Sequence, residues 1–290
     1  MVQYAVFAKP GTLFVVATPI GNLEDITARA LRILREVAVI AAEDTRRTAH
    51  LLARYTIKTP TTSLHEHNEA QKAPALVDRL SRGEHVALVS DAGTPAISDP
   101  GRLLIREAVK AGIRVESVPG PNAAVAALAV SGFPTDSFCF MGFPPTRSKD
   151  RARWFERVRS VGGTIVFYEA PHRLRETLRQ LQRAVGDCDV ALCRELTKMH
   201  EELVRGPISV VTETCLSTKG EFTVVANVGQ KPDNIPRYVL ADSEALDEFC
   251  VLTKTELMSR RRAINLIARR HNAAPNEIYA AIERALKYLK

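Results

Sequence analysis

Residues 85–101 read HVALVSDAGTPAISDPG, and this stretch decides the fold class. Its first six residues centre on an apolar run of strand length, which is typical of a strand buried on both faces of a parallel sheet. The next eleven hold two prolines, two glycines and two aspartates, and this composition predicts a long loop. Ligands of open parallel sheets bind beyond the carboxyl ends of the strands, so residues 90–101 are the first candidate binding segment.

Strand-like apolar runs and helical periodicities alternate on both sides of this stretch. Before residue 142, the pattern predicts strands at 13–18, 37–42, 85–90, 114–118 and 137–141 and helices at 26–35, 45–54, 69–81, 102–111 and 123–130. After residue 146, it predicts strands at 164–168, 190–194, 201–206 and 222–228 and helices at 151–160, 173–185 and 207–215. Alternation with short links predicts an α/β fold whose first sheet is mainly parallel.

Prolines mark the expected domain boundaries. The loop at residues 142–146 contains two prolines, which break both helix and strand. A polar linker flanked by Pro232 and Pro236 precedes two helical segments, at 255–271 and 276–289. We therefore expect a flexible N-terminal extension at 1–10, an α/β subdomain at 11–142, a second at 146–230 and a basic helical tail module at 236–290.

The composition excludes several classes of protein. Hydrophobic residues make up 46% and charged residues 25% of the 290-residue chain, which excludes collagen-like, coiled-coil and wholly disordered chains. The longest unbroken apolar stretch, residues 123–130, is far shorter than the ~20 residues that span a bilayer, and we find no signal-peptide pattern. The five scattered cysteines form no C-x-x-C pair, which indicates reduced thiols. We expect a cytoplasmic protein with no membrane partner.

The formal net charge of +7, from 40 basic and 33 acidic side chains, is spread unevenly. Residues 1–145 carry +1, residues 146–183 carry +6, residues 184–253 carry −6 and residues 254–290 carry +6. The two arginine-rich blocks favour a polyanionic partner such as RNA, because guanidinium groups bind phosphate well. The alternative is that both blocks are solvated helix faces. The candidate RNA-binding residues are Arg147, Arg151, Arg153, Arg260, Arg261, Arg262, Arg269 and Arg270.

Four loops that follow predicted strands are candidates for binding a ligand: residues 17–27, 90–101, 118–124 and 168–173. The last of them combines an aromatic ring, a carboxylate, an imidazole and a guanidinium. No G-x-G-x-x-G, G-K-[ST] or G-x-S-x-G motif occurs, so the usual dinucleotide, P-loop and serine-hydrolase interpretations lack support. His65 and His67 complete no metal-ligand spacing, and we predict no metal site.

Five motifs along the chain identify a family. They are ATPIGNLED at residues 17–25, SDAGTPAISDPG at 90–101, PGP at 119–121, YEAPHR at 168–173 and RELTK at 194–198. This set closely resembles the ribosomal RNA small subunit methyltransferase I family, a branch of the tetrapyrrole methylase superfamily, over residues 11–230. The resemblance implies two α/β subdomains of the tetrapyrrole methylase type, with S-adenosylmethionine bound in the cleft between them.

The resemblance also implies an activity and partners. A homodimer would methylate the 2′-oxygen of a cytidine in the decoding region of 16S ribosomal RNA, in the small (30S) ribosomal subunit, and would have no DNA partner. Carried over by motif, the residues that would bind the cofactor are Pro19, Asp91, Gly93, Thr94, Ile97, Asn122, Ala123, Tyr168, Cys193 and Thr223.

Catalytic roles are hypotheses at this stage. A ribose 2′-hydroxyl is a weak acid, so a base or a stabilising cation should assist methyl transfer. We favour Arg173 and Lys198 for contacts with phosphate and developing charge, and Glu169 or Glu195 as orienter or base. His172 and Lys219 are further candidates. Two other functions stay open: a small-molecule methyltransferase acting on a tetrapyrrole or similar acidic substrate, and a non-catalytic rRNA-binding or assembly protein.

Overall fold

Five short parallel strands form the first sheet of the computed structural model, which describes residues 9–214, 219–229, 241–255, 258–271, 273 and 275–288. Their order is β3-β2-β4-β1-β5, and every pair is parallel, as predicted. The strands are β1 (Thr12–Val16), β2 (Val39–Ala42), β3 (Thr61–Ser63), β4 (Val86–Val89) and β5 (Arg114–Val118). Because all five run the same way, their carboxyl ends, and the loops that follow, meet at one edge.

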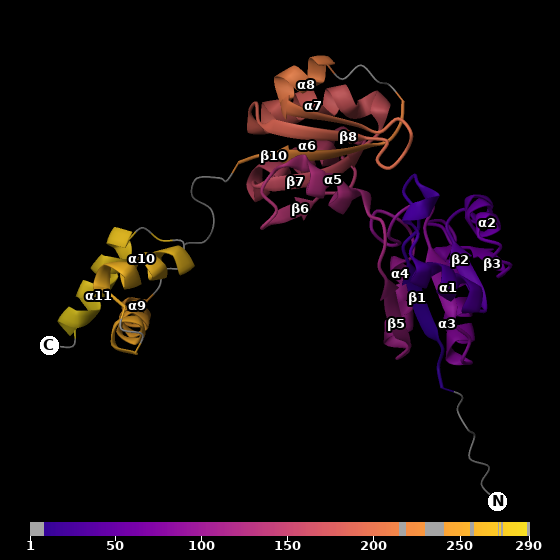
Figure 1. Ribbon diagram of the computed structural model, residues 1–290, viewed down its shortest axis with the longest axis horizontal. Helices are drawn as coiled ribbons and strands as arrows, with labels where there is room; N and C mark the ends of the chain where they lie inside the picture. Colours follow the sequence, from indigo (N-terminus) through magenta and orange to yellow (C-terminus); the bar gives the residue numbers. More distant parts are fainter. Residues whose placement is uncertain are drawn as a thin grey trace, which may run out of the picture. The chain divides into compact units, whose positions relative to one another are not determined.

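Helices cover both faces of this sheet (Figure 1). They are α1 (Ala28–Glu36), α2 (Thr45–Arg54), α3 (Glu69–Ser81) and α4 (Arg102–Lys110). Apolar side chains of α1 and α2, such as Leu34 and Leu51, pack in one core cluster. Those of α3 and α4, such as Leu80 and Leu104, pack in another. The strands between them are buried on both faces, which explains why β2 and β4 consist of apolar residues alone.

The second sheet has the order β6-β7-β10-β8-β9 and is mostly antiparallel. Only β6 and β7 run in parallel, while β10 pairs antiparallel with β7 and with β8, and β8 pairs antiparallel with β9. The strands are β6 (Phe138–Phe140), β7 (Thr164–Glu169), β8 (Asp189–Arg194), β9 (Glu202–Pro207) and β10 (Phe222–Asn227). Central β10 is the last of these strands along the chain.

One helix covers one face of the second sheet and three cover the other. Residues of α5 (Ala123–Ser131) pack with Val166, Ala191 and Val225 on the first face. The opposite face packs with α6 (Ser148–Val161), α7 (Pro171–Val185) and α8 (Ile208–Thr214) around the fully buried Phe167.

The boundary expected at residues 142–146 is misplaced relative to the sheets. Strand β6 precedes those prolines and already pairs with β7, and α5 packs on the second sheet. The chain therefore leaves the first sheet after β5, at residues 119–122. Pro144 and Pro145 lie in the connection between β6 and α6, within the second subdomain. Prolines break strands both at a subdomain boundary and inside a subdomain, so their presence alone does not distinguish residues 142–146 from residues 119–122 as the boundary.

The chain divides into two compact units, Met1–Gln230 and Lys231–Lys290. The second holds α9 (Asp242–Cys250), a five-residue π-turn at Val251–Thr255, α10 (Arg260–Arg270) and α11 (Pro275–Tyr288). Its own core includes Phe249, Ile267 and Ile282. Helix α9 was not predicted, whereas α10 and α11 lie within the two expected segments. Of the expected flexible extension, residues 1–8 lie outside the described residues. No helix in the described ranges is both long and apolar enough to cross a membrane.

Candidate active site

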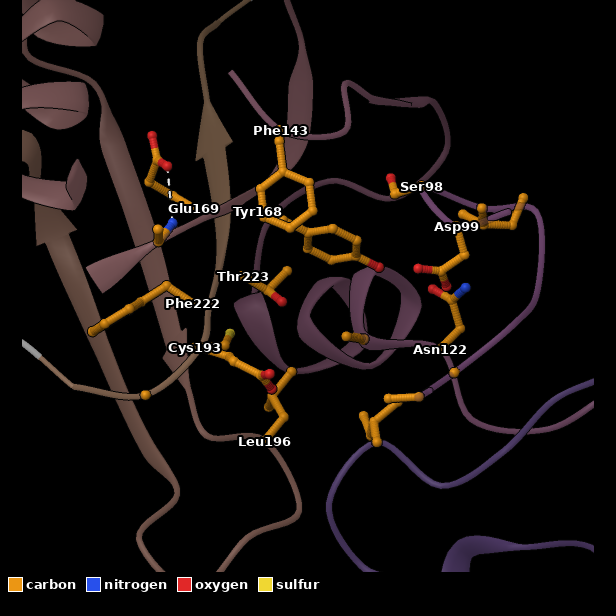
Figure 2. A pocket seen from close by; sticks show the side chains of 18 of the residues that line it. Ser98, Asp99, Asn122, Phe143, Tyr168, Glu169, Cys193, Leu196, Phe222 and Thr223 are labelled. Carbon is orange, nitrogen blue, oxygen red and sulfur yellow. Dashed lines mark hydrogen bonds between the residues drawn. The ribbon is translucent and has the colours of Figure 1, made fainter. Parts of the chain in front are cut away.

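A row of three side chains crosses the middle of the second sheet. Thr223 of β10 is paired with Tyr168 of β7 on one side and with Cys193 of β8 on the other. Residues paired in this way project from the same face of a sheet, and here that face is covered by α5. All three line a single cavity (Figure 2). Burial raises the pKa of the Cys193 thiol to about 12, so this cysteine stays protonated and packs as a small apolar residue.

The cavity has a volume of about 340 Å³ and is built by both subdomains. The first subdomain supplies residues from the loops that follow β1, β4 and β5, all at the carboxyl edge of the parallel sheet. The second supplies the Tyr168–Thr223–Cys193 row, the start of α7 and three further loops. Its complete lining is Ile20, Ala92, Gly93, Thr94, Ile97, Ser98, Asp99, Asn122, Ala123, Phe143, Tyr168, Glu169, Ala170, Pro171, Cys193, Leu196, Gly220, Glu221, Phe222 and Thr223.

Eight of the ten expected cofactor residues line this cavity, and two do not. Pro19 is buried next to a two-way backbone bridge, in which Thr18 and Gly93 exchange N–H···O hydrogen bonds of 2.9 Å. The carboxylate of Asp91 is engaged elsewhere, since it accepts a hydrogen bond of 3.0 Å from the Asp44 N–H and lies 3.3 Å from Arg47. The eight that do are Gly93, Thr94, Ile97, Asn122, Ala123, Tyr168, Cys193 and Thr223.

The loop after β4 has a strained backbone, and it contains an aspartate, Asp99, whose pKa is raised. Ala96 and Ser98 both have φ near +66°, a left-handed conformation that costs free energy for residues with a side chain and is common at ligand sites. Asp99 lies across the cavity from Thr223, beside Asn122 (Figure 2). Burial, reinforced by the charges of Glu43 and Asp91, raises the pKa of the Asp99 carboxyl to about 7, although a hydrogen bond with Ser90 opposes the shift.

The loop after β8 joins the two subdomains. The hydroxyl of Thr197 accepts a hydrogen bond of 3.0 Å from the backbone N–H of Asn22. Lys198 lies 3.0 Å from Glu195 and 2.9 Å from Glu221. Burial lowers the pKa of Lys198, but hydrogen bonds to these two carboxylates outweigh it and raise the pKa overall. The same contact lowers the pKa of Glu195 against the effect of its own burial, so the pair stays ionised.

Glu195 and Lys198 flank the cavity without lining it. Their neighbours Leu196 and Glu221 do line it. The Glu195 carboxylate also accepts a hydrogen bond of 2.9 Å from the Glu221 N–H. A carboxylate with these partners and a lowered pKa is a weak base, and its contacts are those of a residue that positions Lys198.

Glu169 faces away from the open part of the cavity (Figure 2). Its side chain is fully buried and accepts hydrogen bonds from the Ala170 N–H, at 2.8 Å, and from the Thr177 hydroxyl. The guanidinium groups of Arg173 and Arg151 lie 3.4 and 3.8 Å from it. This partner set anchors the start of α7 and leaves the carboxylate poorly placed to act as a base, so of the two roles expected for Glu169 the contacts favour that of an orienter.

Arg173 and Arg151 hold the proline-rich loop. Arg173 donates hydrogen bonds to the carbonyl oxygens of Pro144 and Pro145, and Arg151 donates to that of Pro145 at 3.3 Å. Arg151 also binds Thr177 and Gln180 at 2.6 Å, and only 12% of its side chain is exposed. These contacts do not fit the RNA-binding role expected for Arg151, because its largely buried guanidinium is engaged by Pro145, Thr177 and Gln180.

The other candidate cations are distributed over both units. Arg147 and Arg153 are exposed on or beside α6. On α10, Arg260, Arg261 and Arg262 are exposed, and Arg260 lies 3.9 Å from Glu283. Arg270 is paired with Glu248 at 2.7 Å, and the side chain of Arg269 lies outside the described part of the chain. The expectation that these residues bind RNA stays a prediction.

Sequence reasoning missed several residues of the site. Phe143 and Leu196 line the cavity, but Phe143 lies in a segment interpreted only as a loop that breaks helix and strand, and Leu196 lies in the RELTK motif without a role of its own. Asp99 was noticed as part of its loop and was not assigned a role. An exposed aromatic residue between a glycine and two prolines was the available signal for Phe143. Among the described residues, His172 is exposed and no group of histidine, cysteine and carboxylate side chains suits a metal ion.

This chain is similar to known proteins in both its sequence and its fold. Residues 12–212 match the family described as Tetrapyrrole (Corrin/Porphyrin) Methylases. A protein of Halalkalibacterium halodurans named ribosomal RNA small subunit methyltransferase I is 43% identical over 274 residues, which is 93% of each chain. The protein of the same name from Thermotoga maritima is 49% identical over 217 residues, covering 74% of this chain and 97% of that one.

Solved structures show the same fold at lower identity. Uroporphyrin-III C-methyltransferase from Thermus thermophilus, in complex with S-adenosylhomocysteine, superposes with a TM-score of 0.53 at 18% identity and covers 75% of this chain and 98% of that one. Diphthine synthase superposes with a TM-score of 0.58 at 14% identity, covering 74% and 90%. At this identity the likeness concerns the fold alone.

Proposed function

Because this chain belongs to the tetrapyrrole methylase family, and within it to the ribosomal RNA small subunit methyltransferase I family, we propose that it methylates the small-subunit rRNA from S-adenosylmethionine. The specific reaction we propose is 2′-O-methylation of a cytidine in the decoding region of 16S rRNA. The observation that carries the proposal is the cavity, because residues from both subdomains converge on it and eight of the ten cofactor positions that the family resemblance implies line it.

The cavity fits the chemistry of S-adenosylmethionine. Its volume of about 340 Å³ lies within the range of about 300–1,000 Å³ that is usual for small-molecule sites. Ile97, Ala123 and Leu196 provide apolar walls that suit an adenine ring. Hydroxyl, amide and carboxyl groups of Thr94, Asn122 and Asp99 provide partners for ribose and amino-acid groups. When bound, this cofactor supplies a methyl group activated by a sulfonium sulfur.

The protein's own contribution is positioning and charge. Holding the ribose oxygen in line with the methyl group supplies much of the rate enhancement of such a transfer. Lys198 stays protonated beside the cavity, where its charge stabilises a developing alkoxide or an adjacent phosphate. Glu195 and Glu221 fix its ammonium group. Glu169 and Arg173 act as positioning residues, because they order the start of α7 and the proline-rich loop.

Exposed arginines would bind the RNA backbone. Arg147 and Arg153 on the α6 side of the first unit, and Arg261 and Arg262 in the second, are available to phosphate oxygens. The family resemblance further implies a cytoplasmic homodimer, which sedimentation analysis of the purified protein tests directly.

The decisive experiment is mapping of 2′-O-methyl groups in 16S rRNA from a deletion strain and from the same strain complemented with this chain. We expect one cytidine of the decoding region to lose its methyl group and regain it. Transfer of labelled methyl groups to 30S subunits and to uroporphyrinogen, measured side by side, separates the proposal from a small-molecule methyltransferase. Calorimetric titration with S-adenosylmethionine separates it from a scaffold, which would bind none.

A further inference from the structure

Phe143 is an exposed aromatic ring at the wall of the cavity. It is 54% exposed, yet it lines the cavity and lies against Tyr168, with ring centroids 5.3 Å apart and planes tilted by 57°. Tyr168 in turn contacts Phe140 edge to face at 5.0 Å. Figure 2 shows the Phe143 and Tyr168 rings side by side above the Thr223 row. An aromatic surface is thus presented at the wall of the cavity.

The backbone around Phe143 is held on both sides. The carbonyl of Met141 accepts a hydrogen bond of 3.2 Å from the Trp154 indole, and that of Gly142 accepts one of 3.0 Å from the Tyr168 N–H. On the other side, Pro144 and Pro145 are bound by Arg173. Hydrogen bonds thus hold this segment on both sides of Phe143, so the ring is presented in a defined position at the cavity wall.

The surroundings of the ring match a nucleotide. Arg147 and Lys149 follow Phe143 closely in the chain, and both are exposed. Within the described residues, neither takes part in an ion pair, in contrast to Arg153, which lies 4.0 Å from Asp150. An exposed aromatic ring followed in the same segment by exposed cations suits single-stranded nucleic acid, because bases stack on such rings and phosphates pair with the cations.

We propose that Phe143 stacks on the base of the target nucleotide, or of its immediate neighbour, and so places the ribose at the cavity. This inference rests on the proposed rRNA methylation and adds to it a positioning residue and a substrate conformation. The nucleotide is bound unpaired, with its base on Phe143 and its phosphates toward Arg147 and Lys149. Selection by stacking is tolerant of base identity, so sequence choice comes from the rest of the RNA.

The test compares variants at two exposed phenylalanines. Methyl transfer to 30S subunits is measured for Phe143→Ala and Phe143→Trp. The control is Phe138→Ala, because the Phe138 ring of β6 is 46% exposed and does not line the cavity. We expect Phe143→Ala to lower kcat/KM about 5- to 100-fold, mainly through KM, as loss of one stacked base predicts. Phe143→Trp should restore most of the activity, and Phe138→Ala should match the wild type.

Two results would overturn the inference. One is wild-type kcat/KM in Phe143→Ala. The other is a loss of S-adenosylmethionine affinity, measured by calorimetry, as large as the loss in kcat/KM, because the ring would then serve the cofactor.

A binding measurement separates failure of this inference from failure of the proposed function. Trp154 is the only native tryptophan and is buried, so Phe143→Trp and Phe138→Trp each add one exposed reporter. Titration with a single-stranded oligoribonucleotide of the decoding-region sequence should quench the fluorescence of Phe143→Trp and leave Phe138→Trp unchanged. Equal quenching in both, or none, refutes stacking at Phe143 even if the wild type methylates rRNA. Quenching at Phe143 without methyl transfer refutes the proposed function instead.

Discussion

The backbone N–H of Asn22 donates a hydrogen bond to the side-chain hydroxyl of Thr197, 3.0 Å away and 175 positions later in the chain. It links the loop after β1 in the first sheet to the loop after β8 in the second. Ile20, two residues before Asn22, and Leu196, one residue before Thr197, both line the cavity. The closeness of these two loops therefore sets part of the cavity wall.

The contact leaves no room for a side chain at Gly21. An added Cβ would lie 2.5 Å from Cγ of Lys198 and 2.9 Å from the carbonyl oxygen of Leu196. We expect Gly21→Ala to push the loops apart and to weaken S-adenosylmethionine binding about tenfold in calorimetry, since the wall then loses contacts with the ligand. Gly112→Ala is the control for backbone strain alone, because its φ of +70° disfavours a side chain while an added Cβ meets nothing within 4 Å, so S-adenosylmethionine affinity should stay at the wild-type value. Unchanged affinity in Gly21→Ala would show that the loops do not shape the site.

Lys198 is expected to contribute to methyl transfer and not to the binding of S-adenosylmethionine. Lys198→Ala removes the cation beside the cavity, and we expect kcat for methyl transfer to fall about 100-fold while S-adenosylmethionine affinity stays within about twofold. Glu195→Ala should give the same pattern more weakly, because Glu221 still holds the ammonium group. Wild-type turnover in both variants would remove this pair from the mechanism.

Asp99 makes stability depend on pH. Its pKa is about 7 in the folded protein against about 3.9 in an unfolded chain, so the folded state binds the proton more tightly. The contribution of Asp99 to the free energy of unfolding is greatest below about pH 4, decreases as the pH rises to about 7 and stays low above it. Urea denaturation of Asp99→Asn should therefore show a gain over the wild type at pH 8 and none at pH 4. The exposed Asp136→Asn should show no such difference between the two pH values.

Glu169 is expected to matter for folding more than for proton transfer. Glu169→Ala leaves the buried Arg151 and nearby Arg173 without their shared carboxylate, and loss of one partner from a buried ion pair costs about 3–5 kcal/mol. Denaturant melts should show this loss, and Glu169→Gln should keep more of the stability because its single amide oxygen still accepts from either Ala170 or Thr177. A Glu169→Gln protein that is fully stable but inactive would restore the base hypothesis.

The second unit is expected to contribute electrostatically to RNA binding. The double variant Arg261→Ala/Arg262→Ala removes two exposed cations of α10. Each lost phosphate contact should reduce the slope of log affinity against log salt by about 1, measured with 16S rRNA. Arg270→Ala, whose guanidinium is engaged by Glu248, should leave the slope nearly unchanged. Equal slopes for wild type and double variant would assign α10 a packing role only.

The first sheet was predictable because its strands are buried on both faces. Apolar runs such as Val86–Val89 carry the signal by themselves. Strand β3 consists of Thr-Thr-Ser, all half-buried, and gives no such run. The antiparallel pairing of the second sheet could not be predicted from the sequence for another reason. Pairing depends on β10 inserting between β7 and β8, a contact between segments far apart in the chain.

The sequence is more informative where loops follow strands than where burial decides the role of a residue. Thr94 and Asn122 lie in loops that follow β4 and β5, and both line the cavity, while their role in cofactor binding stays a prediction. Arg151 and Arg153 look equivalent in the sequence, yet one is buried by contacts with Thr177 and Gln180 and the other is exposed. Only the packing of α6 against α7 distinguishes them, and that packing depends on residues of both helices.

The place of β10 in the second sheet has a consequence for how the protein is made. Its neighbours β7 and β8 emerge from the ribosome earlier and can pair with β6 and β9, but β10 lies between them, so the two halves of the sheet are joined only when β10 arrives. Thr223, the middle residue of the row at the cavity, arrives with this strand. A growing chain that ends before residue 222 therefore has no complete cavity, and the competence to bind a ligand appears only after most of the chain has been synthesised.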